Sequence, residues 1–219
     1  MNKQLNPLNP ISYGGFNWWE VGGKTCLAAY QAKGASSQSD AISNLANPGT
    51  YDLSLILGTV GWSQSLGFLF TNSGAYTTGL NASSVGTVIV SVLCDISAIH
   101  QSVLGANDTT SGKLMRIRYD NNTNLYLYNG GTSNYNTPRP ADIDGVWCMA
   151  EEKMYLDGSY IGASSGGLKA DYPIYLGAYN YNNTSTFQAM NGSIAAVAFY
   201  VEELTPTDVT NLTANIQSI

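Results

Sequence analysis

The stretch Lys153–Leu204, KMYLDGSYIGASSGGLKADYPIYLGAYNYNNTSTFQAMNGSIAAVAFYVEEL, decides the fold of this chain. Near its start, Asp157-Gly158 lies between two runs of strand-forming residues. This dipeptide tolerates the positive φ angles that a two-residue hairpin turn needs. We therefore predict a hairpin in which Met154–Leu156 pairs with Ser159–Gly162.

Two more strands are predicted further along the same stretch. Apolar residues alternate with other residues from Ile174 to Tyr179, which is the period of a strand with two unlike faces. Asn191-Gly192 is then expected to turn the chain into Ser193–Val201, an almost unbroken apolar run. Such a run is typical of a strand that is buried on both faces.

The order of these short motifs carries a resemblance. Tyr155–Gly158, Ile174–Ala178 and Asn191–Tyr200, closing on Leu204–Val209, resemble the C-terminal half of concanavalin A-like lectin/glucanase domains. Within that superfamily, these motifs resemble the laminin-G-like and pentraxin-like modules of phage and bacterial surface proteins. The resemblance implies an all-β fold, a two-sheet antiparallel jelly-roll sandwich. Thr205, with Asp208 three residues later, predicts a capped short C-terminal helix towards Ile216.

The rest of the chain supplies further strand patterns. Met115, Ile117 and Tyr119 alternate with Leu114, Arg116 and Arg118, and after a turn at Asp120–Asn124 the residues Leu125 and Leu127 alternate with Tyr126 and Tyr128. This pattern predicts a second hairpin. Single strands are predicted at Cys26–Ala32, Gly67–Phe70, Ala75–Gly79, Thr87–Asp95 and Val146–Ala150. Glu151–Lys153 is a short connection, so the pairing of Val146–Ala150 with the Asp-Gly hairpin stays open.

Length and composition favour one domain. With 219 residues and 44% hydrophobic content, the chain can bury a sizeable core, and all-β sandwiches of this size are commonly single domains. Only 11% of residues are charged, which is typical of short strands joined by polar turns. We predict a jelly-roll domain over residues 24–219, preceded by an N-terminal extension over residues 1–23.

Charge excludes some partners. The formal net charge is -6 and the nine Lys and Arg residues are scattered, whereas a nucleic-acid binder needs a basic stripe. An anionic membrane surface is disfavoured for the same reason, and the longest apolar runs are far shorter than the roughly 20 residues of a membrane helix. The first ten residues, MNKQLNPLNP, lack the apolar core of a secretory signal. We therefore expect a protein that is made in the cytoplasm, or that reaches the outside by being assembled into something. The resemblance to phage surface modules implies a virion, with the protein made in the host cytoplasm.

Two interpretations are open for the aromatic cluster near the N-terminus. Phe16, Trp18 and Trp19 can plug one end of the sandwich, since large aromatic side chains usually serve burial. Alternatively, Trp18 and Trp19 dock the chain onto a larger assembly.

Catalysis is not expected. A glycoside hydrolase needs two carboxylates at a fixed separation, and the Glu-x-Asp-x-Glu-type strand motif of the glucanase branch is absent. Glu151 and Glu152 are adjacent and would point to opposite faces of a strand. We therefore predict a protein without enzymatic activity.

Calcium is the one cofactor left open. Asp120–Asn124 begins like an oxygen-rich calcium loop but lacks the following Gly and the distal Glu. Asp95, Asp142 and Asp144 are isolated acids. The resemblance to laminin-G-like and pentraxin modules implies rim calcium, although no matching ligand set is present.

Surface loops remain as recognition elements. Between two predicted strands, aromatic rings and amides alternate in Tyr179, Asn180, Tyr181, Asn182 and Asn183. Rings and amides together suit a sugar, whose apolar face stacks on a ring while its hydroxyls take hydrogen bonds. Asn134, Tyr135 and Asn136 form a second set of this kind. The competing interpretation is an ordinary polar turn, because Asn fills turns for backbone reasons.

Three functions follow from these observations. The first is a non-enzymatic module of a phage fibre, spike or decoration protein that binds host or mucosal glycan. The second is a purely structural virion protein that contacts other virion proteins, and the third is an atypical glycoside hydrolase that would use Glu151 or Glu152. Trimers are frequent among phage appendages, but no residue fixes the oligomeric state.

Overall fold

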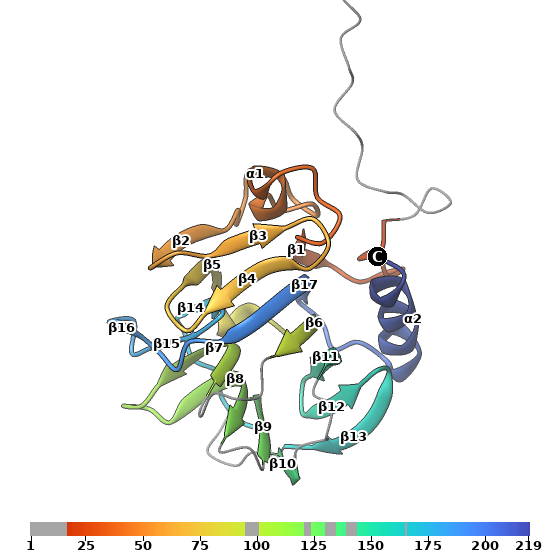
Figure 1. Ribbon diagram of the computed structural model, residues 1–219. Helices are drawn as coiled ribbons and strands as arrows, with labels where there is room; N and C mark the ends of the chain where they lie inside the picture. The colour runs from red at the N-terminus through yellow and green to blue at the C-terminus, as the bar shows by residue number, and fades with distance from the viewer. Residues whose placement is uncertain (1–16, 95–100, 121–123, 130–134, 139–143, 165) are drawn as a thin grey trace, which may run out of the picture.

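A computed structural model describes residues 17–94, 101–120, 124–129, 135–138, 144–164 and 166–219 (Figure 1). Within this part of the chain, two β-sheets pack face to face as a sandwich. We call the eight-stranded sheet the back sheet and the nine-stranded sheet the front sheet. The strand pairs are antiparallel, except that β15 runs parallel to β7. The two-sheet sandwich with a C-terminal helix confirms the predicted fold class.

The back sheet has the strand order β13-β12-β11-β6-β17-β4-β3, with β1 also paired to β17. Its strands are β1 (Cys26–Gln31), β3 (Gly61–Ser63), β4 (Gly67–Thr71), β6 (Thr87–Cys94), β11 (Gly145–Ala150), β12 (Lys153–Leu156), β13 (Ser159–Ala163) and β17 (Asn191–Tyr200).

The front sheet has the strand order β10-β9-β8-β7-β14-β5-β2, and β15 joins it at β7. Its strands are β2 (Ser54–Leu57), β5 (Ala75–Asn81), β7 (Gln101–Asp108), β8 (Lys113–Asp120), β9 (Asn124–Asn129), β10 (Tyr135–Pro138), β14 (Pro173–Leu176), β15 (Tyr179–Tyr181) and β16 (Ser185–Phe187). The helices are α1 (Gln38–Ile42), the 3-10 turn η1 (Ala82–Ser84) and α2 (Pro206–Gln217).

Strand β17 is buried on both faces, as its apolar run predicts. Val197 and Phe199 point into the core between the sheets, while Ala198 and Tyr200 face the opposite side under α2. The expected turn at Asn191-Gly192 is wrong, because both residues belong to β17 and pair with β4. A Cβ on Gly192 would lie 2.3 Å from the Leu93 carbonyl oxygen, so this glycine permits close approach to β6.

Tight turns join β11, β12 and β13. Asp157 and Gly158 have φ angles of 47° and 76°, which confirms the predicted two-residue hairpin turn. Glu151 has a φ of 46° and turns the chain from β11 into β12 together with Glu152. The pairing left open by the sequence is therefore an antiparallel hairpin in which Ala150 lies opposite Lys153.

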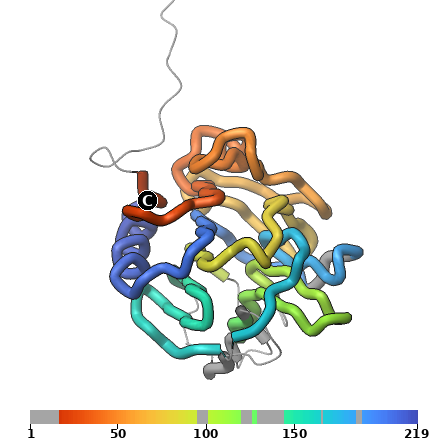
Figure 2. Tube along the Cα trace, turned by 180° about the vertical axis from the view of Figure 1, so that it is seen from behind, coloured from red at the N-terminus to blue at the C-terminus, as the bar shows by residue number. Residues whose placement is uncertain are grey.

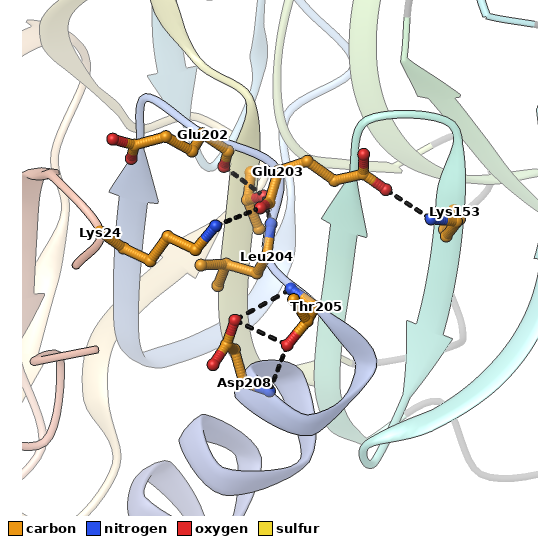
Figure 3. A network of polar contacts seen from close by, with 8 residues as sticks. Lys24, Lys153, Glu202, Glu203, Leu204, Thr205 and Asp208 are labelled. Atoms are coloured by element: carbon orange, nitrogen blue, oxygen red, sulfur yellow. Dashed lines mark hydrogen bonds and ion pairs between the residues drawn. The ribbon is translucent and has the colours of Figure 1, made fainter. Parts of the chain in front are cut away.

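Helix α2 covers the outer face of the back sheet (Figure 1). It begins with the predicted capping box: the Thr205 hydroxyl accepts a hydrogen bond from the Asp208 N–H at 3.2 Å, and an Asp208 carboxylate oxygen accepts from the Thr205 N–H at 3.0 Å. Just before the helix, Glu203 is ion-paired with Lys153 at 2.6 Å (Figure 3). These contacts fix the position at which the chain leaves β17 for α2.

Thr205→Ala is expected to lower the free energy of unfolding by about 1 kcal/mol, because the Asp208 N–H loses its acceptor. Urea denaturation measures the change. Thr207→Ala is the matched control, because Thr207 lies two residues after Thr205 and is exposed. It is expected to change the free energy of unfolding by less than about 0.5 kcal/mol. Equal losses in the two variants would contradict a capping role for Thr205.

Trp18 and Trp19 are buried in the chain itself, at 7% and 6% exposure. They pack edge to face beside α2, and Figure 2 shows their segment alongside that helix. The Tyr200 hydroxyl donates to the Trp19 carbonyl at 2.7 Å, which ties the segment to β17. The two indoles thus serve burial, on the outer face of the back sheet rather than at one end of the sandwich, and docking onto a partner stays a prediction. Phe16 lies outside the described residues.

Candidate functional site

The segment predicted as a recognition loop forms a small hairpin. Its strands are β15 and β16, and Asn182 and Asn183 make the turn with φ angles of 51° and 55°. Asn is among the few residues that adopt this left-handed conformation readily. The abundance of Asn in this segment therefore has a backbone cause, as the competing interpretation expected.

Two asparagines of the hairpin hold it in place. The Asn182 N–H donates to the Asn107 carbonyl at 2.8 Å, and the Asn182 side-chain oxygen accepts from the Thr109 N–H at 2.8 Å. Asn180 is fully buried and donates to the Pro173 carbonyl at 2.9 Å. These side chains attach β15 to the end of β7 and to β14, so they position the hairpin.

The remaining predicted residues divide by exposure. Tyr179 is 4% exposed, whereas Tyr181 is partly exposed and Asn183 is exposed. Tyr179 and Asn180 therefore support the surface from below, and contact with a ligand stays a prediction for the others. Tyr135 lies in the edge strand β10, and Asn134 lies outside the described residues.

The hairpin adjoins a set of aromatic and basic side chains on the front sheet. Strand register places Arg116 opposite Tyr128 and Arg118 opposite Tyr126. Met115, Ile117 and Leu127, which alternate with them, lie in the core, so the four side chains belong to the outer face. We call this surface the tyrosine–arginine platform, and it consists of Arg116, Arg118, Tyr126, Tyr128, Tyr179 and Tyr181.

Ring contacts order the tyrosine–arginine platform. The Arg116 guanidinium carbon lies 4.4 Å from the Tyr179 ring centroid and 5.0 Å from that of Tyr128. The Arg118 guanidinium carbon lies 5.4 Å from the Tyr126 ring centroid. The rings of Tyr126 and Tyr128 are nearly parallel, with an interplanar angle of 14°. Such cation–π contacts restrict the rotamers of both partners.

Gly105 makes this arrangement possible. It lies opposite Arg116 on β7, and a Cβ at this position would come within 2.9 Å of the Arg116 Cβ and 2.6 Å of the Met115 carbonyl oxygen. With no side chain there, Arg116 extends from β8 across β7 to the Tyr179 ring on β15.

Burial shapes the electrostatics of the tyrosine–arginine platform. Desolvation lowers the pKa of Arg116, and the nearby positive charge of Arg118 lowers it further. An arginine nevertheless stays protonated at neutral pH, because its pKa starts far above this range. Desolvation raises the pKa of Tyr179, although Arg116 acts in the opposite direction. Arg116 is thus a buried cation whose guanidinium lies against the Tyr179 ring.

The predicted acidic residues have other surroundings. Glu151 lies in the β11–β12 turn and is ion-paired with Lys169 at 3.2 Å. Asp144 accepts from the Cys94 N–H at 3.0 Å. Asn121–Thr123, Asp95 and Asp142 lie outside the described residues. Within the described ranges no group of three or more His, Cys, Asp and Glu residues could hold a metal, and both calcium binding and the lack of catalysis stay predictions.

A hollow on another part of the surface has polar groups that are already paired. Its lining includes Lys169, which donates to the Val85 carbonyl and contacts Glu151. Asp171, also in the lining, accepts from Ser83 at 2.7 Å and from Asn81 at 3.2 Å. The polar groups of Lys169 and Asp171 in this hollow are therefore engaged by other residues of the chain.

In the part of the chain that the structure describes, no helix is long and apolar enough to cross a membrane. The sequence matches no protein-family model and no curated protein.

Several solved structures are similar to this chain. Domain 4 of AbnA, a GH43 extracellular arabinanase from Geobacillus stearothermophilus solved with arabinotriose, has a TM-score of 0.63 and 17% identity over 87% of this chain and 98% of that one. Trypanosoma rangeli sialidase in complex with sialic acid has a TM-score of 0.62 and 13% identity over 88% of this chain. The receptor-binding domain of a botulinum neurotoxin C/D mosaic serotype has a TM-score of 0.56 and 12% identity over 86% of this chain.

The chain spans 33% of the sialidase and 51% of the toxin domain. At these identities the similarity shows the fold alone. Carbohydrate- and receptor-binding proteins share this β-sandwich with the chain.

Proposed function

We propose that this chain is a non-enzymatic glycan-binding module of the concanavalin A-like type, and that the tyrosine–arginine platform is its contact surface. The observation that carries the proposal is the pre-arranged set of partly exposed Tyr126, Tyr128 and Tyr181 rings on the outer face of the front sheet. Tyrosine supplies a large apolar contact with a polar end at a low cost in conformational entropy. The guanidinium groups add donors for sugar oxygens.

The similar structures support the sugar as ligand class. One of them is an arabinanase domain with bound arabinotriose, another is a sialidase with sialic acid, and a third is a toxin receptor-binding domain. They include both domains of enzymes and binding domains, so the proposed absence of catalysis rests on the carboxylate pattern of this sequence. Chromatography of a hydrolysable oligosaccharide before and after incubation with the chain tests that part of the proposal. We expect no cleavage products.

Placement on a phage virion is a further part of the proposal. Its support is the resemblance of the Tyr155–Gly158 and Asn191–Tyr200 motifs to modules of phage surface proteins. Genes for a portal or tail protein beside the coding sequence, and the protein itself in purified particles by mass spectrometry, are the expected findings. A coding sequence surrounded by host metabolic genes would contradict a virion role.

Tyr126→Ala is expected to weaken glycan binding about tenfold, as a central aromatic contact residue does in other interfaces. The measurement is calorimetric titration with the oligosaccharides that bind best on a glycan array, with and without calcium. Tyr160→Ala is the matched control, because Tyr160 is 59% exposed on β13 of the back sheet and should leave affinity unchanged. Equal affinity in both variants would place the binding surface elsewhere, and no binding to any glycan would remove the proposal.

A further inference from the structure

The strands on one side of the sandwich carry no charged residue. No Asp, Glu, Lys, Arg or His occurs in residues 53–94, a segment that includes β2 and β5 of the front sheet and β3 and β4 of the back sheet. β2 and β3 are the outermost strands of their sheets, and β5 and β4 are their neighbours. Residues 58–60 connect β2 to β3, so the two uncharged sheet edges lie on the same side of the molecule (Figure 1).

Strand β2 exposes apolar side chains on this side. All four of its residues are exposed, and Leu55, Ile56 and Leu57 are 55%, 47% and 41% exposed. We call these three side chains the edge patch. Leu66, in the turn between β3 and β4, is 45% exposed beside the outermost strands of the back sheet. Neighbouring exposed apolar side chains mark contact surfaces, whereas scattered single ones do not.

The backbone of β2 is paired on one side. Within the described residues its ladder partner is β5, with Leu55 opposite Tyr76 and Leu57 opposite Ala75. Proteins commonly protect such an edge with a charged residue, a proline or a bulge. β2 has neither charge nor proline, but a bulge at Ile56 interrupts its ladder. The bulge and the shortness of the strand oppose the addition of further strands, while the side chains stay available for packing.

Charge decides which partner this side fits. The chain has a formal net charge of -6, so two copies repel each other overall. An isologous contact brings the same patch of two copies together about a two-fold axis, and it therefore requires a patch that can face its own image. A charged patch would place like charges opposite each other, whereas the edge patch carries no charge. A charged partner would lose the hydration of its charges here without gaining a counter-charge.

We propose that two copies of this chain associate through the edge patch as a two-fold symmetric dimer. The three half-exposed side chains offer on the order of 300 Å² of apolar surface, whereas a standard interface buries about 800 Å² per partner. The edge patch thus forms the centre of the contact, and the uncharged residues of β3 and of the β3–β4 turn surround it. A contact of this size predicts a dissociation constant in the micromolar range rather than an obligate dimer.

Association leaves the tyrosine–arginine platform open. β5, β14 and β7 lie between β2 and β8 in the front sheet, so the platform is about 20 Å from the edge patch. A dimer carries two platforms, and under the proposed glycan-binding function the second contact with the same glycan-coated surface is intramolecular. The dimer itself does not depend on glycan binding, so each proposal can fail without the other.

Analytical ultracentrifugation of the full chain, at concentrations from about 1 to about 500 μM, tests the proposal. A monomer–dimer equilibrium is expected. About 0.5 M NaCl is expected to tighten it, because salt screens the repulsion between two acidic chains and no ion pair holds the edge patch. A chain that stays monomeric at the highest concentration overturns the proposal, and so does a trimer, because a three-fold contact is not isologous.

Ile56→Lys is the main variant, because Ile56 lies in the middle of the edge patch and is exposed. It is expected to raise the dissociation constant of the dimer about tenfold or more, since each lysine would face its own image. Tyr160→Lys is the matched control: Tyr160 is 59% exposed on β13, the outermost strand at the other side of the back sheet, and the substitution changes net charge equally. Equal weakening in both variants overturns the role of the edge patch.

Chemical crosslinking tests the same contact without adding charge. Ile56→Cys places a thiol in the middle of the edge patch, and a short bismaleimide is expected to join two copies through it. The wild-type chain, with its partly exposed Cys26, and Thr207→Cys on α2 are the controls and should give little crosslinked dimer. A thiol in Ile56→Cys that fails to react with a monofunctional maleimide would show that the chain itself covers the patch. That result, or a dimer that does not crosslink there, overturns the proposal.

Discussion

Trp147→Ala is expected to lower the free energy of unfolding by about 4 kcal/mol, the largest effect that we predict for one substitution. Trp147 on β11 is fully buried and is among the largest side chains of the core. Its ring meets Tyr119 of β8 edge to face, with centroids 6.4 Å apart, so the contact joins the back sheet to the front sheet. Alanine would leave a cavity between the sheets that neighbouring rigid strands cannot fill.

Urea denaturation followed by circular dichroism measures this change. Trp62→Ala is the matched control, because Trp62 is only partly buried on the short edge strand β3. It is expected to lose about half as much, since less apolar surface is re-exposed and only one hydrogen bond, to the Ala32 carbonyl, is removed. A loss below about 1 kcal/mol for Trp147→Ala would mean that this ring does not join the two sheets.

Gly177→Ala is expected to lower the free energy of unfolding by about 3 kcal/mol. The residue has a φ of 79°, and a Cβ there would lie 2.1 Å from ring carbons of Phe70 on β4 of the opposite sheet. Part of the cost is the left-handed backbone, and the larger part is the collision in a close-packed core. Gly177 also precedes Tyr179 by two residues, so a shift here would move the ring that stacks on Arg116.

Gly23→Ala separates the two costs. Gly23 has a similar φ of 74° but nothing within 4 Å of the added Cβ, so its substitution carries the backbone cost of about 1 kcal/mol alone. Thermal and urea unfolding of both variants give the difference, which we attribute to Phe70. Equal losses would show that Phe70 moves aside without cost.

Local chemistry made much of the fold predictable. Asp157-Gly158 sets a turn through its own backbone preferences, and the Thr205–Asp208 spacing sets a helix start, so both are readable from a few adjacent residues. The same reasoning failed at Gly192, where a glycine is needed because the Leu93 carbonyl of a neighbouring strand lies too close for a side chain. In the sequence, a glycine that makes a turn cannot be told from a glycine that lets two strands approach closely. Only the pairing of β17 with β6 distinguishes the two cases.

The candidate site was less accessible to sequence reasoning. The Tyr179–Asn183 segment was predicted as a recognition loop with an ordinary turn as the competing interpretation, and nothing local in the sequence tells that Tyr179 and Asn180 are buried. Arg116, Arg118, Tyr126 and Tyr128 were visible only as the alternate residues of a predicted hairpin. Their meeting with Tyr179 depends on the register of β8 with β9 and on the attachment of β15 to β7. The second of these pairings joins residues more than 60 positions apart.

The central claim is that the tyrosine–arginine platform binds a sugar, and a crystal structure of the full chain with the oligosaccharide that binds best on the glycan array tests it most directly. We expect electron density for the sugar on the outer face of β8 and β9, with its ring against Tyr126 or Tyr128. Density for the sugar in the hollow lined by Lys113 and Lys169 instead, with the tyrosine–arginine platform unoccupied, would contradict the claim.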